Sequence, residues 1–413
     1  MTQRILIIGA GFAGMWSALA AARVLDQAGQ AQIDQGRIDQ GNGSIEIALI
    51  APEPLLHVRP RLYETDAGGM TAPLTNLFNA VGVRYIQGRV ERISTSANEV
   101  EVIDADGQIS TLTYDRLVLA AGSRLFRPEI PGLDEHGFSV DQLDEAAELE
   151  AHIKALGGLP ETPARNTIVV AGGGFTGIET ATEMPARLRA ALGNDANIKV
   201  VIIEQADEIG PDLGPGPRPV IKQALADLGV SWQVGTAVAG LDANGVRTST
   251  GEYIPSKTVI WTAGARASSL TEQIPAERDG YGRLHVDRDL RVIGVANVYA
   301  TGDVARAATD DDGHHSMMSC QHAMNLGRFA GHNVAADLLG LPSQPYSQPR
   351  YVTCLDLGPW GAVYTEGWER QVKLTGADAK ALKRKINTQW IYPPRADRAE
   401  ALASAEPKRL VIA

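Results

Sequence analysis

The stretch IVVAGGGFTGIE, residues 168–179, is an apolar run that leads into glycines and then into residues that can begin a helix. Its glycines have the spacing G-x-G-x-x-G, and ILIIGAGFAGM (residues 5–15) repeats that spacing near the start of the chain. In such a turn the first glycine permits the tight bend, the second lets the backbone approach a pyrophosphate, and the third lets the helix pack closely on the strand. The sequence therefore predicts two dinucleotide-binding turns, formed by Gly9, Gly11 and Gly14 and by Gly172, Gly174 and Gly177.

Apolar strand candidates alternate with helical stretches along most of the chain. Examples are IEIALIA, RLVLAAG, KVVIIE, TVIWTAG and NVYATGD, and the rhythm restarts near Asn166. Alternation of this kind is typical of parallel sheets covered by helices. We therefore predict an α/β protein with two Rossmann-like domains. The segment 26–44, in which IDQG occurs twice, is interpreted as a surface insertion.

Bulk composition is that of an ordinary globular protein of 413 residues, with a net charge of −11 and 44% hydrophobic residues. The negative charge argues against a nucleic-acid-binding face, which needs clustered Lys and Arg. Residues 5–22 carry no charge, but the glycines favour a buried strand and helix over a membrane span or signal peptide. Two cysteines without a CxxC pair favour a reducing, cytoplasmic location. DDDGHH (310–315) is interpreted as a solvated loop, and no metal site is predicted.

The two glycine turns differ in the acid that follows the next strand. KVVIIE ends in Glu204, which can accept hydrogen bonds from a ribose 2′-hydroxyl and would repel a 2′-phosphate, so NADH is favoured over NADPH. IEIALIA has no such acid, and Glu53 is the nearest candidate. Each glutamate could instead be a plain charge at a strand end or in a turn.

Three further segments complete the pattern: LVLAAGS with Ala121 and Gly122, VIWTAGA with Gly264, and VYATGDVA with Gly302 and Asp303. The set resembles the two-dinucleotide-binding flavoprotein reductases over about residues 1–340. The resemblance implies that the first glycine turn and the Gly-Asp segment hold FAD, while an inserted second domain holds NADH. It implies an FAD domain at 1–135 and 266–340, an NADH domain at 136–265 and a C-terminal section at 341–413.

Within that superfamily, GGGFTGIE looks like the type II NADH dehydrogenases, NADH:quinone reductases of membrane surfaces. The resemblance places Glu179 near nicotinamide and flavin as a catalytic residue, although a helix-end carboxylate can also be purely structural. The family's quinone pattern, Ala-Gln-x-Ala-x-Gln, is matched in part by CQHAMN, so Gln321 and Asn325 are candidates for the acceptor site. The absence of CxxC after the first turn excludes a disulfide reductase.

Residues 378–392 resemble the start of the family's membrane-contacting C-terminal region. An apolar stripe of Leu382, Ile386 and Trp390 lies beside four basic residues, Lys380, Lys383, Arg384 and Lys385. A basic amphipathic helix of this kind could lie on an anionic bilayer, or it could pack on its own protein. Peripheral membrane contact and a homodimer are both left open.

Other features keep rival functions open. The segment APEPLLHVRPRLYE, with Arg59 as a flavin-lining candidate, resembles ferredoxin reductases. Cys320 and Cys354 raise the possibility of a sulfide:quinone reductase, although the intact second turn argues against it. A redox sensor related to apoptosis-inducing factors is a third alternative. The function predicted first is an FAD-dependent NADH dehydrogenase with a quinone-like acceptor.

Overall fold

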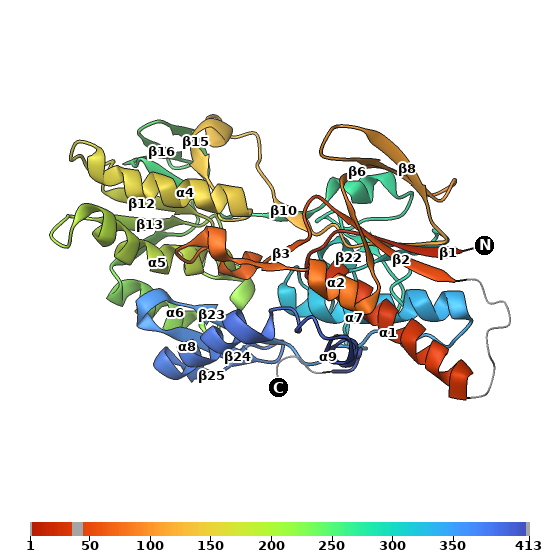
Figure 1. Ribbon diagram of the computed structural model, residues 1–413. Coiled ribbons are helices and arrows are strands. Elements are labelled where there is room, and N and C mark those ends of the chain that lie inside the picture. The colour runs from red at the N-terminus through yellow and green to blue at the C-terminus, as the bar shows by residue number, and fades with distance from the viewer. Residues whose placement is uncertain (1, 35–43, 410–413) are drawn as a thin grey trace.

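The computed structural model describes residues 2–34 and 44–409. Figure 1 shows two lobes side by side, with the C-terminal part of the chain running beneath both. Each lobe is built on a five-stranded sheet whose paired strands are all parallel. The predicted fold class, two Rossmann-like units in an α/β chain, is confirmed.

The sheet of the first lobe has β1 at its centre. Its order is β5 (Arg84–Gln87), β2 (Ile45–Ala51), β1 (Gln3–Ile8), β9 (Arg116–Leu119) and β21 (Val298–Ala300). Helices α1 (Phe12–Asp34), α2 (Thr75–Val81) and α7 (Cys320–Leu339) belong to this lobe. Since β21 follows β9 in the sheet but lies far beyond it in sequence, the chain leaves this lobe, forms the second and returns.

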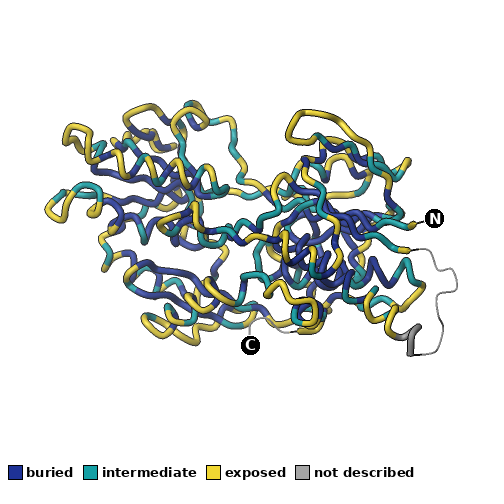
Figure 2. The backbone as a smooth tube through the Cα atoms, viewed as in Figure 1, coloured by how far each residue is buried: buried dark blue, intermediate teal, exposed yellow. Residues whose placement is uncertain are grey.

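The sheet of the second lobe repeats this order for four strands, but its fifth strand comes from the start of the lobe's sequence rather than from its end. It runs β14 (Val230–Gln233), β13 (Lys199–Ile203), β12 (Thr167–Ala171), β18 (Thr258–Trp261) and β11 (Gly137–Phe138). Its helices are α3 (Leu133–His136), α4 (Leu143–Ala155), α5 (Phe175–Leu192) and α6 (Arg218–Asp227). All five residues of β12 are buried, as expected of a central parallel strand, and the centres of both lobes are dark in Figure 2. The domain boundaries at 135, 265 and 340 stay predictions.

An antiparallel meander precedes the fourth strand of each central sheet. In the first lobe it is β6 (Arg89–Ser94), β7 (Glu99–Ile103) and β8 (Ile109–Thr113), and in the second β15 (Val238–Asp242), β16 (Gly245–Thr248) and β17 (Tyr253–Pro255). Three two-stranded pairs complete the set: β3 (Leu55–His57) with β4 (Thr71–Pro73), β10 (Ser123–Leu125) with β19 (Ala265–Ala267), and β20 (Leu284–His285) with β22 (Ala305–Arg306). The pair β10–β19 lies at the crossing between the lobes (Figure 1). The pair β20–β22 is parallel and the others are antiparallel. The sequence did not predict the meanders or these short pairs.

Helices α1 and α7 cross at very close range. A Cβ on Gly327 would overlap the carbonyl oxygen of Ala13, and a Cβ on Gly331 would overlap that of Ser17. Only glycine lets the two backbones approach this closely. Helix α1 continues to Asp34, well into the predicted insertion, and the rest of that insertion lies outside the described residues.

The C-terminal section connects the cores of both lobes. It contains β23 (Val352–Asp356), β24 (Ala362–Glu366), β25 (Gln371–Thr375), α8 (Gly376–Lys385), a π-helix (Ile386–Trp390) and α9 (Arg398–Ser404). Leu355 and Val363 belong to the apolar cluster of the second lobe, whereas Cys354 and Tyr364 belong to that of the first. This alternation fits strands with both faces covered. No helix among the described residues is long and apolar enough to cross a membrane.

Candidate active site

The first glycine turn follows β1 and opens α1. Gly9 has φ +107°, and a Cβ on Gly14 would overlap the Gly9 carbonyl oxygen. A Cβ on Gly11, by contrast, would meet nothing within 4 Å. The first and third glycines are thus required by the protein's own packing. The second faces open space, as a backbone that must admit a pyrophosphate should.

The second glycine turn, between β12 and α5, has the same geometry. Gly172 has φ +111°, a Cβ on Gly177 would overlap the Gly172 carbonyl oxygen, and a Cβ on Gly174 would meet nothing within 4 Å. Both turns therefore share one geometry, in which the first and third glycines are packed and the second faces open space.

The Gly-Asp segment lies against the start of α1. Gly302 has φ +69°, and a Cβ there would lie 2.7 Å from the Cβ of Ala13. The side chain of Asp303 accepts a hydrogen bond from Ser123 Oγ at 2.7 Å. Ser123 begins β10, immediately after the predicted cofactor residues Ala121 and Gly122, so the segments after β9 and β21 meet at one edge of the first sheet.

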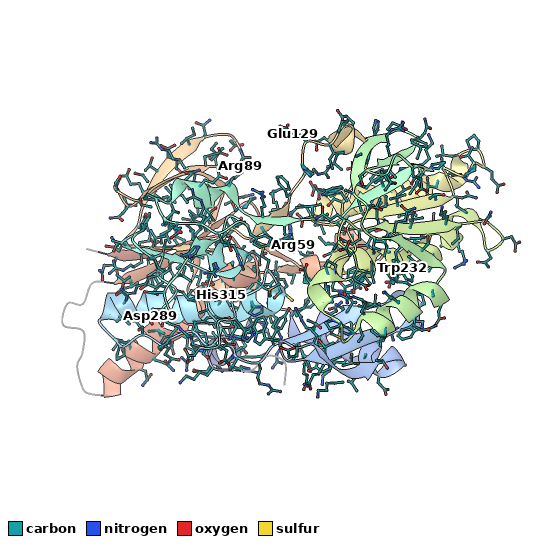
Figure 3. All side chains as sticks on the ribbon, turned by 180° about the vertical axis from the view of Figure 1, so that it is seen from behind. Arg59, Arg89, Glu129, Trp232, Asp289 and His315 are labelled. Atoms are coloured by element: carbon teal, nitrogen blue, oxygen red, sulfur yellow. The ribbon has the colours of Figure 1, made fainter. Side chains whose placement is uncertain are left out.

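Arg59 joins this group from the short helical turn 59–61. Its guanidinium donates to Ser123 Oγ at 3.2 Å and to the Asp141 carbonyl oxygen at 3.1 Å, and it pairs with the Asp141 carboxylate. One Arg59 nitrogen lies 3.8 Å from Asp303. Figure 3 shows Arg59 near the junction of the two lobes. The flavin-lining candidate is therefore held beside Asp303, as the predicted site requires.

Gly264 lies in the turn after β18, on the way back to the first lobe. Its φ is +77°, and its carbonyl oxygen accepts the Phe126 N–H at 2.7 Å. Gly122, with φ +68°, accepts the Ser268 N–H at 2.9 Å. These two glycines thus shape the paired strands β10 and β19 that join the lobes, which is a structural role independent of any cofactor.

The two ribose candidates have different surroundings. Glu204 is buried, and its carboxylate accepts the N–H of Gly173 at 2.6 Å and that of Ala206 at 2.8 Å. It therefore lies beside the second glycine turn, and a carboxylate has lone pairs left for two ribose hydroxyls. Glu53 lies after β2 with a side chain that is 58% exposed, 3.4 Å from His57.

Glu179 forms the most buried ion pair among the described residues. Its Oε1 lies 2.8 Å from Lys383 Nζ and accepts the Asp356 N–H at 2.9 Å. Lys383 also donates to the Cys354 carbonyl oxygen at 3.0 Å. Both side chains of the pair are less than a tenth exposed. A helix of the second lobe and a helix of the C-terminal section are joined here by one charged contact.

A second charged contact lies beside this pair. The carboxylate of Asp356 pairs with Lys380 and accepts the Tyr63 hydroxyl at 3.1 Å. Lys380 lies 3.8 Å from Glu183, one helical turn beyond Glu179. Tyr63 brings the first lobe into contact, so all three parts of the molecule meet at these carboxylates.

Burial governs the ionisation of this group. It raises the pKa of Glu179 to about 7, although the Lys383 ammonium lowers it. Burial lowers the pKa of Lys383, but the carboxylate of Glu179 outweighs it, so the net direction is upward. Burial also raises the pKa of the Cys320 thiol to about 11 and that of Cys354 to about 12, so neither is a thiolate at neutral pH. Glu179 can therefore hold or release a proton near neutral pH.

The acceptor candidates lie in the first turns of α7. The Gln321 amide oxygen is buried and has no hydrogen-bond partner among the described residues. A bound molecule with an O–H or N–H group would satisfy it. The Asn325 amide donates to Gln348 Oε1 at 3.1 Å, and Gln348 also accepts the Tyr346 hydroxyl. Asn325 is thus engaged by the segment after α7, whereas Gln321 keeps a free acceptor.

The basic residues of 378–392 do not form one outward face, so part of this helix packs on its own protein. Lys383 is buried against Glu179 and Lys380 pairs with Asp356, whereas only Arg384 and Lys385 are exposed. The pattern of a charged residue beside an apolar stripe cannot distinguish an exposed charge from one paired inside the protein. No group of three or more His, Cys, Asp or Glu that could hold a metal occurs among the described residues.

Comparison with known proteins places this site in a family. The model of the pyridine nucleotide-disulphide oxidoreductases matches residues 3–327. The chain belongs to this family. An NADH dehydrogenase-like protein of Mycobacterium tuberculosis is 46% identical over 98% of both chains. A demethylphylloquinone reductase of Synechocystis is 29% identical (93% of this chain, 91% of the relative), and a type II NADH:quinone oxidoreductase of Staphylococcus epidermidis is 25% identical (94% and 95%).

The fold agrees with these relatives. The structure of NDH2 from Plasmodium falciparum in complex with NADH has a TM-score of 0.75 at 17% identity, covering 98% of this chain and 97% of that one. The predicted resemblance to NADH dehydrogenases and the predicted class, an FAD-dependent oxidoreductase that uses a pyridine nucleotide, are confirmed. The open Gly11 and Gly174 positions fit the two cofactors.

Proposed function

We propose that this protein oxidises NADH and reduces a quinone. The observation that carries this proposal is the duplicated glycine turn. Gly11 and Gly174 both face open space, so one chain can hold two dinucleotides, one in each lobe. The names of the Synechocystis and Staphylococcus relatives support a quinone as the acceptor. Overall, NADH, a proton and the quinone would give NAD⁺ and the hydroquinone.

In this proposal each candidate residue has one task. Gly9, Gly11 and Gly14 would hold the FAD pyrophosphate, with Asp303 and Arg59 beside it, while the second turn and Glu204 would hold NADH. Bound FAD supplies the ability to take two electrons from a nicotinamide and deliver them to an acceptor. Glu179 would hold a proton near the reacting rings, and Lys383 and Asp356 would fix its position. The side-chain amide N–H of Gln321 would donate a hydrogen bond to a carbonyl oxygen of the quinone.

The test is steady-state NADH oxidation by the purified protein against several acceptors. Short-chain quinones should support rapid turnover, whereas oxidised ferredoxin and oxygen should not. Turnover with ferredoxin but not with quinones would favour the ferredoxin reductase. A reduced protein that reoxidises slowly with every acceptor would favour the redox sensor.

Peripheral membrane contact is proposed on narrower grounds than the sequence suggested. Arg384 and Lys385 are exposed, and Lys385 Nζ lies 4.9 Å from the centre of the Trp390 ring. Two cations and an interfacial aromatic ring favour weak contact with anionic lipid. Sedimentation with anionic and neutral vesicles tests this, with Arg384→Gln/Lys385→Gln as the variant. Whether the protein forms a homodimer is left open and can be measured by size-exclusion chromatography.

A further inference from the structure

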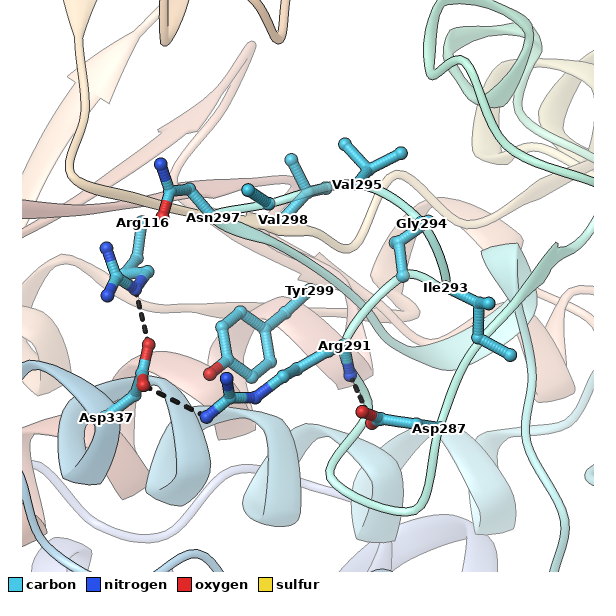
Figure 4. A pocket seen from close by; sticks show the side chains of 12 residues that line it. Arg116, Asp287, Arg291, Ile293, Gly294, Val295, Asn297, Val298, Tyr299 and Asp337 are labelled. Atoms are coloured by element: carbon cyan, nitrogen blue, oxygen red, sulfur yellow. Dashed lines mark hydrogen bonds and ion pairs between the residues drawn. The ribbon is translucent and has the colours of Figure 1, made fainter.

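A pocket lies on the edge of the first sheet opposite the glycine turn. Its volume is about 650 Å³, and it is formed by Arg116, Asp287, Asp337 and the loop 291–299 (Figure 4). Arg116 begins β9 and Val298 begins β21, so the pocket lies at the amino ends of these parallel strands. The proposed FAD turn follows the carboxyl end of β1, which runs parallel to β9. The pocket is therefore separate from the proposed redox site.

Two arginines in this pocket share one carboxylate. Asp337, near the end of α7, pairs through one oxygen with Arg116 Nε and through the other with an Arg291 nitrogen at 3.0 Å. Arg116 Nη2 and the Arg291 nitrogens Nε and Nη1 make no hydrogen bond to a described residue. The Asp287 carboxylate accepts the backbone N–H groups of Asp289 and Arg291 and so fixes the loop. The guanidinium groups thus retain donors for a further oxygen ligand.

Tyr299 adds a donor between the arginines. Its residue exposure is 1%, and its hydroxyl faces the Asp337 carboxylate. Burial, together with this carboxylate, raises the pKa of the hydroxyl, but the hydroxyl makes no hydrogen bond of normal geometry to a described residue. Figure 4 shows this hydroxyl pointing toward the head groups of Asp337 and Arg291. A buried hydroxyl that lacks a hydrogen bond of normal geometry is costly, and natural proteins rarely leave one unless something else completes the bond.

The outer side of the pocket is apolar. Ile293 is 57% exposed and lies next to Gly294 and the partly buried Val295 in the loop that precedes β21. An exposed isoleucine beside unused arginine donors favours a ligand with a charged end and an apolar end. Pockets of several hundred Å³ commonly hold molecules of this size.

We propose that this pocket binds a monocarboxylate with a short apolar chain. The carboxylate would accept hydrogen bonds from Arg116, Arg291 and the Tyr299 hydroxyl, and the chain would contact Ile293 and Val295. Arginine suits this role because its planar head group matches the geometry of a carboxylate. The site lies outside the proposed electron path, so binding does not rest on the proposed function.

Calorimetric titration of the flavin-loaded protein with hexanoate at constant ionic strength tests the proposal. Hexanoate should bind with a Kd of about 1 mM. Acetate should bind more weakly because it lacks the apolar chain, and hexylammonium should not bind. Tyr299→Phe should weaken hexanoate binding about tenfold, as expected for a lost hydrogen bond to a charged group. Its melting temperature without ligand should fall little, because the hydroxyl makes no hydrogen bond of normal geometry to Asp337.

Tyr253→Phe is the matched control. Tyr253 also lies beneath an arginine, Arg247, but its hydroxyl donates to Asp242 at 2.9 Å. This variant should bind hexanoate as the wild type does. Absence of hexanoate binding to the wild type up to about 20 mM would overturn the proposal. So would equal binding by Tyr299→Phe, or a Tyr299→Phe protein that is destabilised, which would show that the hydroxyl serves Asp337 alone.

Discussion

The ammonium of Lys383 lies 2.8 Å from the carboxylate of Glu179, although 204 residues separate them in the chain. Both are buried, so neither can lose its partner without leaving a charge in a poorly solvated place. Glu179 comes from the second glycine-turn helix and Lys383 from the C-terminal section. The pair therefore ties the C-terminal section to the place where the resemblance puts nicotinamide and flavin.

Lys383→Met should raise the pKa of Glu179 above its present value of about 7, because the variant removes the positive charge that lowers it. If the ionisation of Glu179 controls one limb of the pH profile of acceptor reduction, that limb should move to higher pH. Lys383→Arg, which keeps the charge, should leave the limb near its original place, and Lys385→Met is an exposed control. An unchanged profile in Lys383→Met would show that Glu179 does not control that limb.

Stability should depend on pH through the same glutamate. Since burial raises its folded pKa from the ordinary 4.5 to about 7, the folded state holds this proton more tightly than the unfolded state. Its contribution is fully present below pH 4.5 and is lost as the pH rises through 7. Glu179→Gln should flatten this part of the curve when unfolding is followed by denaturant between pH 4.5 and 7. A wild-type contribution that increases over this range would contradict the assigned direction.

Gly11→Val should yield colourless protein. The added side chain would occupy the open space at the second glycine without clashing with the chain itself, so the fold should persist while the pyrophosphate is excluded. The measurement is the ratio of flavin absorbance to protein absorbance, with circular dichroism to confirm folding. Gly29→Val, at another uncrowded position in α1, is the control. Full flavin content in Gly11→Val would refute the assignment of this turn.

Glu204 should make NADH preferred over NADPH. Glu204→Gln keeps the shape of the side chain but removes its negative charge. The preference for NADH over NADPH should therefore decrease, mainly because kcat/KM for NADPH increases. Glu204→Ala should also weaken the binding of NADH, because the hydrogen bonds to the ribose and to the Gly173 N–H are lost. The ratio of kcat/KM values for the two donors is the readout. A wild-type protein with equal kcat/KM values for NADH and NADPH would mean that Glu204 does not bind the ribose.

Gln321→Ala should raise the KM for quinone and leave the rate of flavin reduction by NADH nearly unchanged. One hydrogen bond contributes about 0.5–1.5 kcal/mol net, so an increase of several-fold to about tenfold is expected. Asn325→Ala should have a smaller effect, because its amide is already bound to Gln348. If Gln321→Ala instead slows flavin reduction by NADH, the acceptor and donor sides have been assigned the wrong way round.

Local patterns predicted much of this molecule. The glycine turns could be recognised because Gly9 and Gly14, like Gly172 and Gly177, serve contacts within one strand-turn-helix unit. The antiparallel meanders lack so compact a signal and were missed. The sequence left open whether Lys383 faces lipid or protein because its partner is distant in sequence. Asp141 and Ser123 were not singled out for the same reason. A basic residue at every third or fourth position of a helix has the same pattern whether it faces lipid or a buried carboxylate.

Anaerobic stopped-flow with two successive mixings tests the central claim most directly. NADH is added first and a short-chain quinone second, while flavin absorbance is followed throughout. NADH should bleach the flavin, and quinone should restore its absorbance at a rate no slower than steady-state turnover. A flavin that NADH does not bleach, or that quinone restores more slowly than turnover, would contradict the proposal that this chain passes electrons from NADH to a quinone.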